Sequence, residues 1–405
     1  MKQLVKSKAK GIKKDLIRFI KKLDDIKPGA AYVGELINLA GKEMKSLSFD
    51  DITIDRAGNL IGVVRGYEKK RSVLMLSHID VEAPGRQRSR APGSEGLTNF
   101  KAGIISSIYA AALIKNTMLP LGGDLIVSCV PRLQYCDSEI RYLFDGFSKK
   151  LKEQIKGIIL CEPTDFDINI GNKGRMEYEI VIKGRLGRDF PEHRGVNMLG
   201  AAFPLINELE KVSKELPSDF NLGRSDLKIK DVRYSGYKPR SEMNEFRIVV
   251  DRKFIPEENE DFILNKARSI ARIVYKQDPE VKVNALLAKQ RIKTYTGLEL
   301  ASAKNLKPWS MESHQPFVLE SLQSLVENGF KSKIGYWKKI ITEGAYTYNQ
   351  LGIPTIGFGA GSEDIPLSGK DLCGTGKIEK AAYGQALIVL RNIGMPTFGW
   401  SPNEI

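Results

Sequence analysis

The sequence predicts an α/β protein of two parts, in which a ferredoxin-like α+β domain is inserted into a larger domain with a mixed sheet. Three observations support this prediction. Short apolar runs alternate with amphipathic stretches as far as about residue 174, the pattern changes over residues 176–294, and the alternation returns after residue 308. We therefore expect the larger domain to comprise residues 1–175 and 295–405, and the inserted domain to comprise residues 176–294.

In the larger domain, helices are expected where apolar residues recur at helical spacing, and strands where short apolar runs occur without that spacing. The expected helices cover residues 15–23, 34–46, 101–115 and 381–393. The expected strands cover residues 52–54, 60–64, 73–76, 124–130, 158–161 and 355–358. Strands that alternate with helices in this way predict a sheet covered by helices on both faces.

The inserted domain is expected to begin with an alternating strand at residues 178–182. A helix at 199–216, further strand-like runs such as 246–251, and a helix at 260–275 follow. The order strand–helix–strand–strand–helix–strand is typical of a ferredoxin-like domain.

Composition excludes several classes of protein. The 405 residues are 42% hydrophobic and 28% charged, as in soluble globular proteins. Four cysteines in so long a chain do not form a disulfide framework, so we expect a cytoplasmic protein. The apolar runs are too short for a membrane span. The net charge of +14 leaves an acidic partner open, but the basic residues are scattered and no nucleic-acid-binding motif accompanies them.

His78 and Asp80 lie at the end of the apolar run at residues 73–76. A His-x-Asp pair in this place is how a zinc hydrolase presents a ligand together with the carboxylate that orients it. A catalytic zinc site needs further ligands, yet the chain has only three histidines. Taken alone, the pair is more typical of a hydrogen-bonded structural histidine than of a metal ligand.

Five motifs in the same order resemble those of the di-zinc amidohydrolases that include aminoacylase, acetylornithine deacetylase and succinyl-diaminopimelate desuccinylase, in clan MH. They are SHIDVEAPG (77–85), TNFKAG (98–103), CEPTD (161–165), FPEHRGVN (190–197) and IPTIGFGAG (353–361). The family counterparts are GHxDxVP, [ST]DxKGG, EPT, xPxxGxN and the strand before the last metal ligand. The resemblance covers nearly the whole chain. It implies a zinc-exopeptidase-like domain with an inserted lid domain through which two copies dimerise.

The resemblance assigns metal-site roles to three residues of this chain. His78 matches the first zinc ligand, Asp80 its orienting carboxylate, and Glu162 the glutamate ligand of the EPT motif. At the other functional positions the family residues are replaced. The bridging aspartate becomes Asn99, the general base Leu133, the next ligand Gln134, the C-terminal ligand Leu367, and the oxyanion-binding histidine Arg188.

These replacements leave the second zinc without a conventional ligand, because amide oxygens are poor zinc ligands and leucine offers none. We therefore expect no cofactor, or at most one weakly bound zinc at His78 and Glu162 with Asn99 as a third contact. Loss of the base alone costs about 10²–10⁴ in rate. The sequence thus predicts a catalytically inactive relative that acts as a structural or regulatory binding subunit. Its expected partners are a second copy through the inserted domain, and an active paralogue or another protein.

Two alternatives stay open. One is an active metal-dependent hydrolase of N-acyl amino acids or small peptides that uses a reduced or rebuilt metal site. The other is a sensor that binds an amino-acid-like ligand in the old cleft, with Arg188 or Arg240 contacting its carboxylate. The segment IITEGAY (340–346) departs from the STDG-like pattern of the family, so it does not define the ligand.

Overall fold

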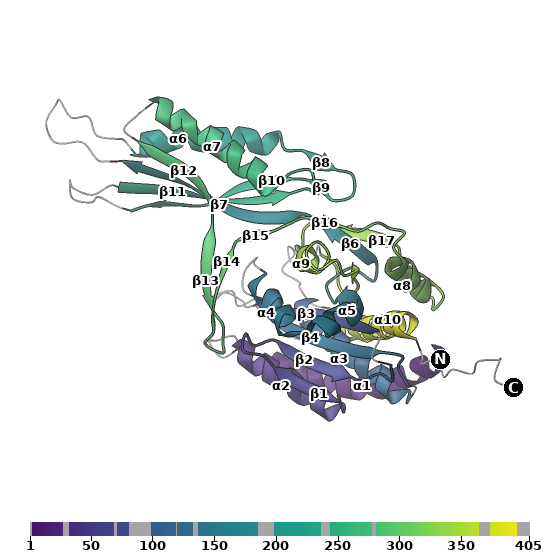
Figure 1. Ribbon diagram of the computed structural model, residues 1–405. Helices are drawn as coiled ribbons and strands as arrows, with labels where there is room; N and C mark the ends of the chain where they lie inside the picture. The colour runs from purple at the N-terminus through teal and green to yellow at the C-terminus, as the bar shows by residue number, and fades with distance from the viewer. Residues whose placement is uncertain are drawn as a thin grey trace. The chain divides into compact units, whose positions relative to one another are not determined.

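The computed structural model describes a chain that divides into two compact units (Figure 1). The residues described are 2–26, 32–68, 71–80, 99–118, 120–132, 137–184, 198–235, 244–277, 281–363 and 373–394. Unit 1 comprises Met1–Asn172, Ile292–Leu300 and Ser310–Ile405, and unit 2 comprises Lys173–Arg291 and Ala301–Trp309. The predicted fold class, a mixed-sheet α/β domain with an inserted α+β domain, is confirmed.

Unit 1 is built on a mixed nine-stranded sheet in the order β1-β2-β4-β3-β5-β18-β6-β16, with β17 paired to β6. Its centre is parallel, because β3 runs parallel to both β4 and β5, and β18 runs parallel to β5. Antiparallel pairing occurs between β1, β2 and β4. The strands are β1 (Asp51–Ile54), β2 (Leu60–Val64), β3 (Ser72–Asp80), β4 (Asp124–Arg132), β5 (Ile155–Leu160), β6 (Ile168–Asn172), β16 (Trp309–Ser310), β17 (Ile334–Trp337) and β18 (Thr355–Gly357).

The helices of unit 1 pack against this sheet and against one another. They are α1 (Lys2–Asp25), α2 (Tyr32–Ser46), α3 (Asn99–Asn116), α4 (Ser138–Gly146), α5 (Lys149–Gln154), α8 (Pro316–Val326), α9 (Gly344–Thr347) and α10 (Thr375–Ile393). Helix α3 contacts β3, α1 and α10, which explains why it is apolar around its circumference. Nevertheless, no helix in the described part of the chain is both long and apolar enough to cross a bilayer.

Unit 2 has the predicted ferredoxin-like order of elements. Its antiparallel sheet follows the order β10-β11-β7-β12, with β15 added to β7. The elements are β7 (Gly174–Gly184), α6 (Met198–Lys214), β8 (Ser218–Asp219), β9 (Gly223–Arg224), β10 (Asp226–Tyr234), β11 (Asn244–Phe254), α7 (Glu260–Gln277), β12 (Lys282–Leu287) and β15 (Asn305–Leu306). A separate ribbon is formed by β13 (Lys289–Lys293) and β14 (Glu299–Ala303).

One face of the unit 2 sheet forms a core with its two helices. Tyr178 and Ile180 of β7 and Ile248 of β11 are buried with Leu205 of α6 and Val274 of α7. Side chains alternate between the two faces of a strand, so the intervening residues of β7 and β11 lie on the opposite face. That alternation is the pattern from which the sequence predicted a strand near residues 178–182.

Candidate metal centre

His78 projects from the carboxyl end of the central strand of unit 1. The four residues from Val73 to Leu76 are at most 2% exposed, because β3 lies between β4 and β5 beneath α3. A buried parallel strand needs a continuous apolar run of this kind. The imidazole of His78 stays buried at the end of this run, so a polar partner is required there.

Glu162 follows the neighbouring strand. It lies two residues beyond the end of β5, and β5 runs parallel to β3. The carboxyl ends of adjacent parallel strands meet at one edge of a sheet, which brings the glutamate to His78. The backbone of Gly359 approaches the Glu162 carbonyl so closely that a Cβ atom at Gly359 would lie 2.4 Å from its oxygen. Only glycine allows this approach without a shift of the backbone.

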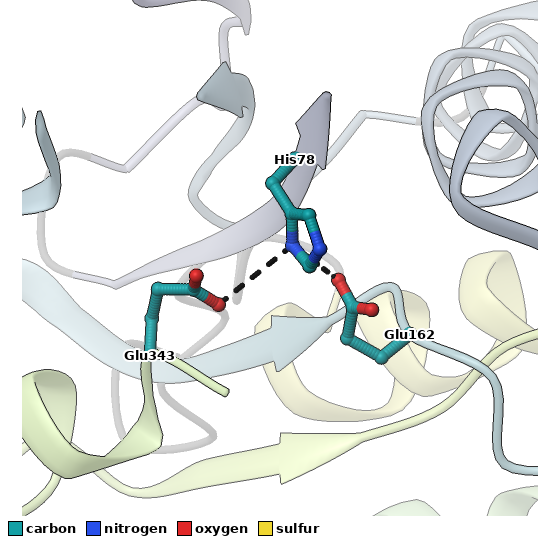
Figure 2. A group of neighbouring side chains, drawn as sticks. All are labelled: His78, Glu162 and Glu343. Carbon is teal, nitrogen blue, oxygen red and sulfur yellow. Dashed lines mark ion pairs between the residues drawn. The ribbon is translucent and has the colours of Figure 1, made fainter. Parts of the chain in front are cut away.

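Glu343 joins His78 and Glu162 in the cluster found among the described residues, and it was not among the site residues predicted from the sequence. It immediately precedes helix α9 and follows an irregular segment that begins after β17. Figure 2 shows the imidazole of His78 lying between the carboxylates of Glu162 and Glu343, which come from separate segments of the chain. Glu343 occupies the position of the aspartate in the family's STDG-like pattern. Because residues 341–344 read ITEG, a search for the exact pattern would not find them.

The three side chains are close together and buried. His78 Nδ1 lies 2.6 Å from Glu162 Oε1 and 3.8 Å from Glu343 Oε2, and the side chains are 2%, 3% and 8% exposed. One potential ligand atom from each residue lies within 4.8 Å of the others. Two ligands of one zinc ion are about 3.4 Å apart at the usual bond lengths of roughly 2.1 Å in a tetrahedral site. The observed distances lie on both sides of that value.

The chemistry of this donor set fits a divalent cation. Two carboxylates and one imidazole gather here in a buried place, where the charge of a carboxylate needs hydrogen bonds or a cation to stabilise it. Oε2 of Glu162 is also buried and has no hydrogen-bond partner among the described residues. A divalent cation beside a neutral imidazole would balance both carboxylates and give this oxygen a partner. Histidine and carboxylate are ordinary ligands for such a cation.

The nearby thiols do not join this donor set. Burial raises the pKa of the Cys129 thiol to about 12, despite the hydrogen bond that it accepts from Ser77. Burial and the charge of Glu162 raise the pKa of the Cys161 thiol as well. Neither thiol belongs to the group of His78, Glu162 and Glu343, whose potential ligand atoms lie within 4.8 Å of one another.

The structure describes only part of the site predicted from the sequence. It brings His78 and Glu162 together. Of Asp80 and Asn99 it describes the backbone alone, which lies at the last residue of β3 and the first residue of α3 respectively. The remaining predicted residues, Leu133, Gln134, Arg188, Arg240 and Leu367, lie outside the described residues.

Comparisons with known proteins agree with this architecture. Residues 170–279 match the family model of the peptidase dimerisation domain. Two solved structures resemble nearly the entire chain. The di-peptidase Dug1p from Saccharomyces cerevisiae has a TM-score of 0.68 at 10% identity, covering 96% of this chain and 98% of that one. A dinuclear metal-binding peptidase from the M20 family of Bacillus subtilis has a TM-score of 0.67 at 13% identity, covering 95% and 99%.

The chain has the fold of the M20 peptidases. The resemblance predicted from the five motifs is thereby confirmed, and unit 2 contains a peptidase dimerisation domain. A curated relative, the uncharacterized protein YgeY of Escherichia coli strain K12, is 24% identical over 377 residues and matches 89% of this chain and 90% of its own length. The M20-like chain described here therefore corresponds to nearly the whole length of that relative.

Proposed function

We propose that this M20-like protein is a metal-dependent hydrolase of amide bonds in small substrates, of the size of dipeptides or N-acyl amino acids. The observation that carries this proposal is the buried group of His78, Glu162 and Glu343 at the carboxyl edge of the central strands. It is supported by the buried Glu162 oxygen, which has no hydrogen-bond partner in the part of the chain that the structure describes, and by the likeness of the fold to solved peptidases.

The proposed site holds one cation rather than two. His78, Glu162 and Glu343 together supply three good ligands, and three protein ligands plus a water is the usual composition of a catalytic zinc site. A bound divalent cation supplies Lewis acidity and a water whose pKa is lowered to about 7. The residues of the chain hold the cation in a buried place, where electrostatic interactions are stronger than in water.

The proposed activity differs from the inactive protein that the sequence alone predicts. Considered alone, the sequence predicts an inactive relative, because only His78 and Glu162 of the family's ligands remain and Leu133 replaces the base. Glu343 adds a third ligand from an unexpected segment. A cation held by these residues would supply the activated water, and the lack of a side-chain base at position 133 would lower the rate by about 10²–10⁴. We therefore expect a slow enzyme.

A screen of dipeptides and N-acyl amino acids with protein loaded separately with Zn²⁺, Mn²⁺ or Co²⁺ tests this function. We expect turnover that is abolished in His78→Ala and in Glu343→Gln. Glu43→Gln is the matched control, since Glu43 is a buried carboxylate of unit 1 that accepts a hydrogen bond from Tyr109, a contact that glutamine preserves. Turnover that survives in His78→Ala would contradict the proposal.

The second candidate is a non-catalytic binding subunit, and the observation that favours it is Leu133 at the position of the family's base. In this case the metal-loaded protein shows no turnover on any amide substrate and instead co-purifies with a partner, such as an active paralogue.

We propose a homodimer through unit 2 under either function, because unit 2 contains the dimerisation domain. Light scattering on the purified chain at several concentrations measures this directly, and a monomer throughout would contradict it.

A further inference from the structure

The segment between β17 and α9 carries Glu343 but has neither helical nor strand hydrogen bonding over residues 338–343. A segment of this kind has many conformations available unless other groups fix it. Here three sets of hydrogen bonds hold it at both ends and in the middle. The position of the Glu343 carboxylate therefore depends on contacts made by its neighbours in the chain.

The first contact connects this segment to the other carboxylate. Trp337, the last residue of β17, is fully buried and donates its indole Nε1–H to the carbonyl of Pro163 at 2.7 Å. Pro163 directly follows Glu162 in the sequence. The same indole packs so tightly on Gly357 of β18 that a Cβ atom there would collide with the ring. Trp337 thus fixes the backbone beside Glu162 relative to the start of the Glu343 segment.

The second contact is a backbone nest that binds a carboxylate of the chain itself. Oε2 of Glu363 accepts hydrogen bonds from the successive amides of Lys338 at 3.0 Å, Lys339 at 2.9 Å and Ile340 at 3.5 Å. Consecutive backbone N–H groups that converge in this way form an anion-binding concavity. Hydrogen bonds to a charged acceptor are stronger than those between neutral groups. Glu363 therefore anchors the middle of the segment.

The third contact fixes the residue next to Glu343. Oδ1 of Asn172, at the end of β6, accepts hydrogen bonds from the backbone N–H of Thr342 at 3.1 Å and from its hydroxyl at 2.6 Å. Both Asn172 and Thr342 are fully buried. A side chain that satisfies both donors of one residue leaves that residue little freedom to rotate.

From these contacts we infer that Trp337 and Glu363 are positioning residues of the metal site, which set the distance between the carboxylates of Glu162 and Glu343. This inference rests on the proposed function, because it presumes that both carboxylates bind one cation. Neither residue is a proposed ligand. They act through the backbone that carries the ligands, and partners of this kind typically change metal affinity about 10- to 100-fold when removed.

Metal titration of Trp337→Phe tests the inference, because phenylalanine keeps an aromatic ring and removes the donor to Pro163. We expect the affinity for Zn²⁺, measured against a chromophoric chelator, to fall about 10- to 100-fold with the stoichiometry unchanged. We also expect the visible absorption spectrum of the Co²⁺-loaded variant to differ from that of the parent. Glu363→Gln changes a half-buried residue and is also expected to lower the affinity for Zn²⁺. It still tests the inference if Trp337→Phe fails to fold.

Tyr109→Phe is the matched control, because it also removes one donor from a fully buried aromatic side chain of unit 1. Its affinity for Zn²⁺ should stay within about twofold of the parent. Affinity and Co²⁺ spectra that are unchanged in both test variants would overturn the positioning role and leave the metal site standing. An equal loss in Tyr109→Phe would also overturn it, since the effect would then be a general loosening of unit 1. A parent protein that binds no metal would instead remove the proposed function itself.

Discussion

Replacement of Gly359 by alanine is expected to change both the stability of unit 1 and the binding of metal at the proposed site. The new Cβ would lie 2.4 Å from the carbonyl oxygen of Glu162, whereas ordinary contacts begin near 3.4 Å. One of the two backbones must therefore move by about 1 Å. Gly359 also donates its N–H to Thr164 Oγ1 at 3.1 Å, so the movement disturbs a buried hydrogen bond as well.

The expected cost follows from these contacts. Insertion of a methyl group into a tightly packed place typically costs about 1–3 kcal/mol, and a weakened hydrogen bond adds about 0.5–1.5 kcal/mol. We therefore expect the free energy of unfolding of Gly359→Ala to fall by roughly 2–4 kcal/mol. Because the atom displaced belongs to Glu162, we also expect weaker binding of Zn²⁺.

Urea unfolding followed by tryptophan fluorescence, together with a Zn²⁺ titration, measures both effects. Gly376→Ala is the control, because a Cβ atom at Gly376 meets nothing within 4 Å and lies inside α10, where alanine is favoured over glycine. We expect the control to be as stable as the parent or slightly more so. If Gly359→Ala unfolds at the same urea concentration as the parent and binds Zn²⁺ equally well, the described contact between Gly359 and Glu162 is wrong.

Three further predictions concern unit 2. Leu205→Ala, at a fully buried position of α6, should lower the free energy of unfolding by about 2–5 kcal/mol in urea, and an effect below 1 kcal/mol would argue against the described core. Glu258→Ala should cost about 3–5 kcal/mol by the same measurement, because it leaves the buried guanidinium of Arg252 without its carboxylate, and a small cost would show that water reaches this pair. Burial raises the pKa of Glu177, but hydrogen bonds from two lysines outweigh it and hold the pKa below its usual value. The ionised Glu177 therefore stabilises the fold above about pH 4.3, and this stabilisation is lost as the pH falls further. Glu177→Gln should accordingly lose less stability between pH 7 and pH 3 than the parent. An identical dependence of stability on pH in the two proteins would contradict this prediction.

The sequence could predict the fold because the elements are encoded locally. The buried run from Val73 to Leu76 and the alternation in β7 are visible without any tertiary information. The pairing of His78 with Glu162 was expected from the resemblance to the zinc amidohydrolases. The structure accounts for it, because β3 and β5 are parallel neighbours and their carboxyl ends meet at one edge of the sheet.

The position of Glu343 could not be predicted in this way. It belongs to an irregular segment without periodicity, and its place near His78 depends on contacts made by Trp337, Glu363 and Asn172. Those contacts join residues that are as far apart as 174 positions in the sequence. Hydrogen bonds between a buried indole and a distant carbonyl leave no pattern in a single sequence. The likeness of residues 341–344 to the STDG-like pattern marks Glu343 as a candidate, but only the folded chain shows that it lies beside His78.

The most direct test is the metal content of the protein, purified without chelators and then equilibrated with Zn²⁺. We predict one tightly bound zinc equivalent per chain in the parent and a substantial loss of binding in Glu343→Gln. A parent chain that retains no zinc, or one that binds it equally well after Glu343→Gln, would show that these three side chains do not form a metal centre.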